Sequence, residues 1–164
     1  MARSDGFTLL EALLVVSLLL LMGGLALTPA LESLARQRVE SATRRVLLGL
    51  ERGRQLAERQ GQPCALGFDS AGWGPPRGST LSGCLEESIS LGEGAPEGGG
   101  VLKVEHNLAD AVRFSANGLV LDGGTVVLSH PATSLVRCVV VSLPLGITRV
   151  GMQSNGSCLP DPSL

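Results

Sequence analysis

Glu11 is the one charged residue in an otherwise almost wholly apolar run, residues 7–28. A carboxylate inside a membrane costs about 2.5–3.5 kcal/mol on insertion scales, so one that is retained there normally has a functional partner. The nearest candidate is an amine. Cleavage of the chain after Gly6 would give Phe7 a new α-amino group one helical turn from Glu11. The same amine on a neighbouring copy would make the pairing a device for assembly.

The apolar run is long enough to cross a membrane. At about 1.5 Å per residue, a helix over 7–28 covers about 33 Å, against a hydrocarbon core of about 30 Å. It exceeds the apolar stretch of a secretory signal, about 7–15 residues, and no A-x-A-like cleavage site follows it. We therefore expect residues 7–28 to be retained as a transmembrane helix. An ordinary signal anchor would show the same run without Glu11.

Four cysteines, Cys64, Cys84, Cys138 and Cys158, form an even set without C-x-x-C spacing. This favours disulfides in an exported domain over metal or redox chemistry. Cys64 and Cys84 are 20 residues apart, and so are Cys138 and Cys158. Of the three possible connectivities, two sequential bridges are the simplest.

Catalytic residues are not evident. His106 and His130 are solitary, and no Ser/His/Asp, H-E-x-x-H or clustered carboxylate motif surrounds them. The Gly-rich stretch before residue 101 lacks the G-x-x-x-x-G-K-[ST] signature of a phosphate site. We expect no enzymatic activity, no cofactor and no metal ion.

The charges are segregated along the chain. A formal net charge of -2 excludes a strongly basic nucleic-acid binder on bulk charge alone. Residues 29–60 nevertheless contain seven Arg against four Glu, and residues 61–164 contain five basic and nine acidic groups. The arginines of 29–60 are interpreted as a solvated or subunit-facing surface.

Apolar residues recur at helical spacing from Leu31 to Ala57, which predicts an amphipathic continuation of the helix over 29–60. Gly23, Gly24 and Pro29 should weaken or kink it, and "QGQP" at 60–63 should end it.

The remaining part, 61–164, reads as β-rich, with short apolar runs between turn residues. The expected strands are 64–68, 101–104, 111–115, 119–121, 125–129, 135–142 and 146–151. A connection of 32 residues, 69–100, separates the first two and is rich in Gly and Pro. Trp73 within it is either a docking residue or a cover over a local core. The fold class is therefore α+β, a long helix followed by an antiparallel sheet region.

The stretch Gly6-Phe7-Thr8-Leu9-Leu10-Glu11 before an apolar run resembles the class III signal of type IV pilins and pseudopilins. The resemblance implies that residues 1–6 are a leader, that a prepilin peptidase cleaves after Gly6, and that Phe7 is N-methylated. It implies that Glu11 neutralises the N-terminus of an adjacent filament subunit. The implied partners are other pilins, an inner-membrane assembly platform and membrane lipid. The implied fold is the pilin fold, with a long kinked helix packed on the sheet region.

A second, looser resemblance covers residues 112–151. "VRFSANG", "GTVVLS" and "LVRCVVVSLPLGITRVG" resemble GspH/FimT-type minor pilins and pseudopilins. Some members of that group bind DNA through a Gly-Arg-x-Arg motif in natural transformation. The matching positions here read Gly146-Ile147-Thr148-Arg149, so only Arg149 remains as a possible DNA contact. We expect a noncatalytic filament subunit of a type IV pilus or type II secretion system, with a DNA-binding minor pilin as the alternative.

The membrane topology is inferred from the family resemblance and not from the charges that flank the apolar run. Arg36, Arg38, Arg44 and Arg45 follow the apolar run, whereas Arg3 alone precedes it. By the positive-inside rule the domain would stay in the cytoplasm. The resemblance and the cysteines imply the opposite, an N-terminus in the cytoplasm and a domain exported to the periplasm.

Overall fold

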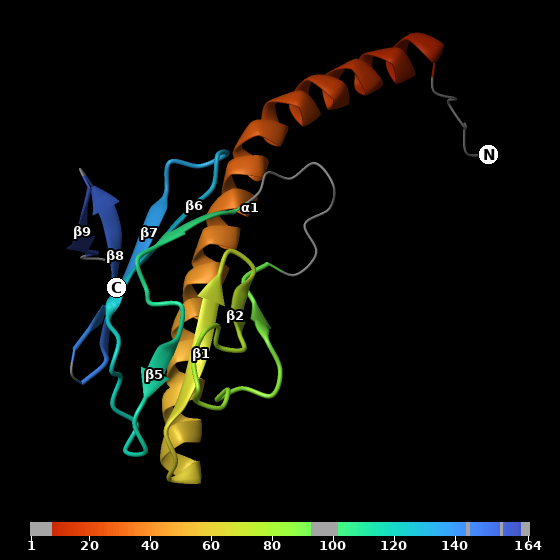
Figure 1. Cartoon of the computed structure of the whole chain (residues 1–164). Helices are drawn as coiled ribbons and strands as arrows, with labels where there is room; N and C mark the ends of the chain where they lie inside the picture. Colours follow the sequence, from red (N-terminus) through yellow and green to blue (C-terminus); the bar gives the residue numbers. More distant parts are fainter. Residues whose placement is uncertain (1–7, 93–101, 144, 155, 162–164) are drawn as a thin grey trace.

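The computed structural model describes residues 8–92, 102–143, 145–154 and 156–161, with backbone alone for 23–29. The expected leader, Gly6 and Phe7 therefore lie outside the described residues, as do positions 93–100 of the long connection. Figure 1 shows one long helix whose first turns extend away from the domain, bend where they meet it, and continue along a two-sheet domain.

Helix α1 (Leu9–Gln60) has 52 residues and ends at recognisable caps. Thr8 is its N-cap, and the Thr8 hydroxyl accepts a hydrogen bond from the backbone N–H of Glu11 at 3.3 Å. Gly61 ends the helix with φ 61°, in the left-handed conformation that favours glycine. The long helix expected from the sequence is present.

The second half of α1 buries one face against the domain. Val39, Ala42, Val46 and Leu50 recur at three- and four-residue spacing, Ala57 follows two turns later, and all are buried. This is the amphipathic continuation that the sequence predicts.

Two glycines of this helix allow it to approach the core closely. A Cβ atom at Gly49 would overlap the indole ring of Trp73, and one at Gly53 would crowd Leu66 and Phe114. The absence of a side chain at these positions lets large core residues pack directly on the helix backbone.

The strands form two antiparallel sheets. The first has the order β3-β2-β1-β5 and is made of β1 (Cys64–Asp69), β2 (Gly72–Gly74), β3 (Ile89–Ser90) and β5 (Val112–Phe114). The second has the order β4-β6-β7-β8-β9 and is made of β4 (Lys103–His106), β6 (Gly124–Ser129), β7 (Val136–Ser142), β8 (Ile147–Ser154) and β9 (Ser157–Pro160). Helix α1 contacts strands of both sheets, so it joins them through a shared core.

The architecture is α+β, with a long N-terminal helix and antiparallel sheets, and is consistent with a pilin fold. Some local predictions were wrong. Residues 119–121 form only an isolated bridge, Phe114 to Val120, and β9 was not expected at all. The described part of the long connection contains two short strands, β2 and β3.

Trp73 is a core residue, so the docking interpretation was wrong. Its side chain is 1% exposed, and its Nε1–H donates to the carbonyl oxygen of Val46 at 3.1 Å. The Trp73 ring also packs against Phe68, with ring centroids 4.6 Å apart. The β2 strand thus covers the helix and fixes the start of the long connection.

Candidate functional site

The helix start presents Glu11 to solvent in the first turn of α1. Thr8 and Glu11 have the spacing of a capping box, of which the structure shows one half, the Thr8 hydroxyl accepting from the Glu11 N–H. A carboxylate here also interacts favourably with the positive end of the helix dipole. The Glu11 carboxylate therefore lies at a favourable position in the first turn, while the observed hydrogen bond uses only the Glu11 backbone.

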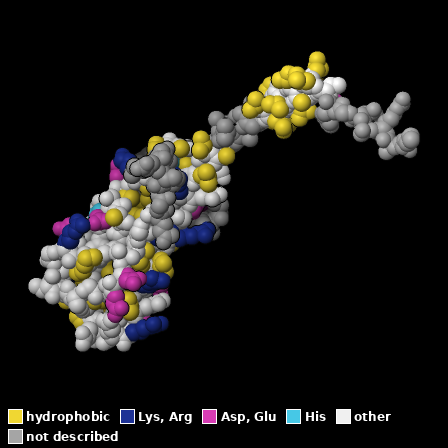
Figure 2. All heavy atoms as spheres, turned by 90° about the vertical axis from the view of Figure 1, so that its right-hand side faces the viewer, with side chains coloured by type: hydrophobic (Ala, Val, Ile, Leu, Met, Phe, Trp, Pro, Cys, Tyr) yellow, Lys and Arg dark blue, Asp and Glu magenta, His cyan; other side chains and the backbone are white. Residues whose placement is uncertain are grey.

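The first turns of α1 form an apolar arm, residues 9–22. Every large apolar side chain of this arm is exposed, from 45% at Val15 to 79% at Leu9. Figure 2 shows apolar side chains around the visible face of this end of the helix, while the charged groups gather over the domain. A contiguous apolar surface of this kind marks a membrane or protein contact.

In the part of the chain that the structure describes, no helix is both long and apolar enough to cross a bilayer.

A buried arginine connects the helix, the second sheet and the segment after β9. Arg137 of β7 donates to Glu40 of α1 from Nε at 2.8 Å and from Nη2 at 2.6 Å, and it also donates to Asp161. Burial alone would lower the pKa of Arg137, but its hydrogen bonds to the Asp161 and Glu40 carboxylates outweigh burial and raise the pKa. We call these three residues the Arg137 clasp.

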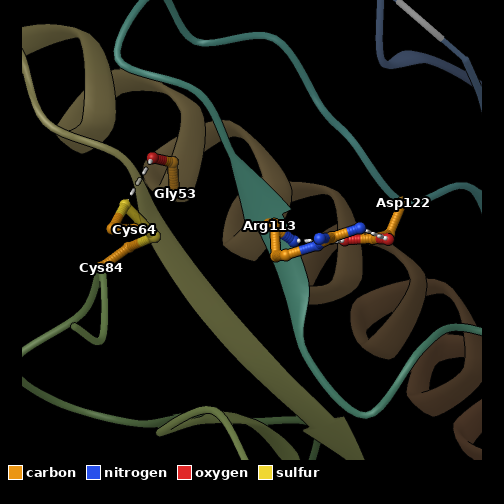
Figure 3. The surroundings of a disulfide bond; sticks show 5 residues. All are labelled: Gly53, Cys64, Cys84, Arg113 and Asp122. Atoms are coloured by element: carbon orange, nitrogen blue, oxygen red, sulfur yellow. Dashed lines mark hydrogen bonds and ion pairs between the residues drawn. A yellow bond between two sulfur atoms is a disulfide. The ribbon is translucent and has the colours of Figure 1, made fainter. Parts of the chain in front are cut away.

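Two disulfides hold the domain: Cys64–Cys84, with Cα atoms 5.1 Å apart, and Cys138–Cys158, with Cα atoms 5.9 Å apart. These are the two sequential bridges that were the simplest connectivity expected from the sequence. Figure 3 shows the first bridge lying against α1, with the Cys64 sulfur 4.0 Å from the carbonyl oxygen of Gly53. Because the oxidised sulfur carries no proton, that approach is a packing contact.

Figure 3 also shows the ion pair between Arg113 of β5 and Asp122. The Arg113 Nε and Nη2 atoms donate to the two carboxylate oxygens at 2.8 Å each, and the Arg113 backbone N–H donates at 2.9 Å. The hydrogen bond from the Arg113 side chain is the main cause that holds the pKa of Asp122 below its usual value. The pair fixes the segment after residue 121 against β5.

The histidines lie apart and contact ordinary structural partners. His106 packs edge-on against Phe68, with centroids 5.1 Å apart. His130 is buried, and its Nδ1 accepts from the backbone N–H of Ala132 at 3.1 Å. Within the described ranges, no group of three or more His, Cys, Asp or Glu is placed to hold a metal ion.

Arg149 lies on β8, exposed, and pairs across the sheet with Val140. The start of β8 borders a hollow of mixed character, lined by Glu51 and Arg54 of α1 together with Ile147 and Thr148. The exposed apolar residues of this end of the domain are Leu119, Leu121, Leu143, Leu145 and Ile147. Gly146 has φ 64° in the turn before β8, and a Cβ there would overlap Val120, so the turn packs on the 119–121 segment.

The comparisons with known proteins give one match. The family model described as type II transport protein GspH matches residues 42–145. The chain belongs to the GspH family. Neither the search of curated proteins nor that of solved structures found a significant match. The match covers most of the domain-packed half of α1 and the strands from β1 to β7, so it confirms the GspH/FimT-type resemblance.

The Arg137 clasp is the feature that sequence reasoning missed. Arg137 interrupts an apolar run, residues 135–141, in the strand expected over 135–142. An arginine in a buried strand needs a carboxylate partner, because an unpaired buried charge is costly. That was the available signal, but neither Glu40 nor Asp161 could be chosen from the sequence.

Proposed function

We propose that this GspH-family chain is a noncatalytic pseudopilin or minor pilin of a type II secretion or type IV pilus filament. The observation that carries the proposal is the exposed apolar arm of α1 with Glu11 at its first turn. The family match supports the class of protein, and the arm supplies the surface by which such a subunit would join others. The sheets and the shared core hold that helix in place.

In this proposal residues 7–28 anchor the precursor in the inner membrane, and the domain lies in the periplasm. Residues 1–6 are removed by a prepilin peptidase after Gly6, and Phe7 becomes the N-methylated N-terminus. An oxidising periplasm is compatible with the two disulfides. Membrane lipid, the peptidase, the inner-membrane assembly platform and other pilins are the partners.

Assembly then moves the arm from lipid into a bundle of neighbouring arms. Both surroundings are apolar, so little hydrophobic free energy is gained or lost in the transfer. Glu11 and the amine of Phe7 on an adjacent subunit would supply the directional contact, because two opposite charges in a low dielectric attract strongly.

N-terminal processing tests the proposal. Mass spectrometry of the envelope protein should find a chain that begins with methylated Phe7, and shearing and sedimentation should recover that chain with filament subunits. The Gly6→Val variant should stay membrane-bound and full length, because a side chain at that position obstructs cleavage. An unprocessed Met1 in filament-associated protein would contradict the proposal.

Binding of DNA is the second candidate, and its one supporting observation is the exposed Arg149. Ile147 occupies the position of the other arginine of the motif and is 51% exposed, so this position offers DNA no positive charge. Phosphate contacts supply most nonspecific affinity for DNA, and a lone arginine supplies few. Filter binding with a salt titration would separate the two functions.

A further inference from the structure

The edge of the second sheet is incompletely covered at β8. Strand β7 pairs with β8 over residues 147–152, whereas β9 pairs with it only over residues 151–154. Residues 147–150 therefore have a strand on one side only, since no third strand of the described ranges pairs with them. We call residues 147–150 the open edge.

An open edge presents backbone N–H and C=O groups of every second residue outward, ready to pair with another chain. Natural proteins usually blunt such edges with charges or prolines. The covering strand β9 ends at Pro160, which has no N–H with which to extend the ladder. On the open edge itself, Arg149 is the single charged residue.

The side chains of the open edge indicate which kind of partner segment would fit beside it. Ile147 and Arg149 are two residues apart, so they lie on the same face of β8. Both are exposed, and Arg149 has no ion pair among the described residues. Leu143 and Leu145, 54% and 56% exposed, extend the apolar surface beside Ile147.

We propose that the open edge is a strand-addition site for an extended, acidic segment of a partner protein. The partner's backbone would continue the sheet beside β8, and a carboxylate would lie directly opposite Arg149. An apolar side chain two residues away would lie opposite Ile147, because directly opposed side chains on one face form the stabilising pairs of a sheet. This inference rests on the proposed function, in which the partner is another filament subunit.

Charge complementarity favours this occupant over nucleic acid. Strand addition needs free backbone groups, which the open edge has, and Arg149 adds a preference for a carboxylate. Nucleic acid requires several cations that track the phosphates, whereas Arg149 is the one cation of the open edge, and the nearby Arg54 lies in a hollow that Glu51 also lines.

Peptide binding to the full chain in detergent micelles tests the proposal. The probe is an acetylated, amidated heptapeptide, TTETVTT, titrated into isotope-labelled protein and followed by backbone amide NMR. Chemical-shift changes and slower amide exchange should concentrate at residues 147–150. The same peptide with N-methyl groups on alternate amides should not bind, because it cannot complete the ladder.

Reversing the charge at Arg149 tests whether this side chain selects the partner segment. Arg149→Glu should weaken TTETVTT binding about fivefold and strengthen binding of TTKTVTT by a similar factor. Arg59→Glu, an exposed reversal on α1, is the matched control and should change neither. Equal binding of both peptides to wild type and Arg149→Glu would overturn the proposal.

Other occupants would be recognised in the same experiment. A single-stranded oligonucleotide that shifts the same amides in an Arg149-dependent way would overturn the proposal in favour of nucleic acid. Concentration-dependent shifts without peptide would assign the edge to a second copy of this chain and overturn the proposal of a different, acidic partner. Binding only after deletion of residues 162–164 would assign the edge to the chain's own end and would overturn the proposal as well. If TTETVTT fails to bind while the wild-type protein still sediments with filaments, only this inference fails and the proposed function stands.

Discussion

The guanidinium of Arg137 in β7 and the carboxylate of Glu40 in α1 are hydrogen-bonded although 97 residues separate them in the chain. The same guanidinium binds Asp161 after β9. One buried side chain therefore joins the helix, the centre of the second sheet and the segment that follows β9. The carboxylate side chain of Asp161 is only 4% exposed, and Arg137 places a positive charge beside it.

Arg137→Met should strongly destabilise the domain. The substitution keeps an apolar stem of similar length but removes the buried guanidinium that bonds Glu40 and Asp161, and breaking a buried ion pair costs about 3–5 kcal/mol. Chemical unfolding of the full chain in detergent, followed by Trp73 fluorescence, measures the loss. Arg77→Met, at an exposed ion pair with Asp69, is the control and should cost about 1 kcal/mol or less. Equal losses for both variants would mean that the clasp contributes no more than a surface pair.

Gly49→Ala should destabilise the domain through overpacking, by about 1–3 kcal/mol. The new Cβ would overlap the Trp73 ring, so the ring must move and its hydrogen bond to Val46 must lengthen or break. Because Trp73 is the only tryptophan, a red shift of the fluorescence would report the displacement directly. Gly74→Ala is the control, since a Cβ there meets nothing within 4 Å. An unchanged spectrum and stability for Gly49→Ala would contradict this packing.

Asp122 should make stability depend on pH in the acid range. Its folded-state pKa is depressed by Arg113, so its contribution is present above the unfolded pKa of about 3.9 and is lost as pH falls through the folded value. Arg113 is half exposed, so solvent screening limits the effect to about 1 kcal/mol. Asp122→Asn should therefore be less stable than wild type at neutral pH, and the gap should shrink toward pH 3.

Asp110→Asn provides the matched control, because Asp110 is exposed and has no ion pair among the described residues. Unfolding curves at several pH values compare the two variants with wild type. A gap for Asp122→Asn that stays constant across the range would mean that the ion pair does not set this dependence.

The sequence predicted the helix well because its signals are local. The spacing of Val39, Ala42 and Val46 defines a buried face, and Gly61 defines the end. The central strands, β6 and β7, were equally clear as apolar runs. The sequential disulfide pairing followed from the simplest connectivity.

Features that depend on distant contacts could not be predicted. Strand β9 contains a proline and a cysteine and carries no apolar alternation; its place depends on the turn at Gly156, with φ 78°, and on the Cys138–Cys158 bridge. The burial of Trp73 depends on the missing side chain at Gly49, which nothing near Trp73 in the sequence indicates. The open edge follows from where β9 stops, which a pattern of single strands does not show.

Glu11→Leu tests the assembly role of the carboxylate. The substitution removes a lone charge and adds apolar surface, so the helix should sit more stably in the membrane. Cleavage after Gly6 should continue, because it occurs at the leader. Incorporation into filaments should fail, since each arriving subunit would bury an unpaired amine, and one uncompensated buried charge costs several kcal/mol. The measurement is the ratio of filament-associated to membrane-resident protein.

Two further variants separate assembly from local helix capping. Thr8→Ala removes the hydroxyl that accepts a hydrogen bond from the Glu11 N–H. It should lower the stability of the first helical turn by about 1 kcal/mol, with little effect on incorporation of the protein into filaments. Glu32→Leu, an exposed glutamate farther along α1, should leave the ratio unchanged. If Thr8→Ala lowers incorporation as much as Glu11→Leu does, Glu11 acts by starting the helix. If only Glu11→Leu lowers it, the carboxylate acts on a partner, and the neighbouring amine is the group whose charge it would balance.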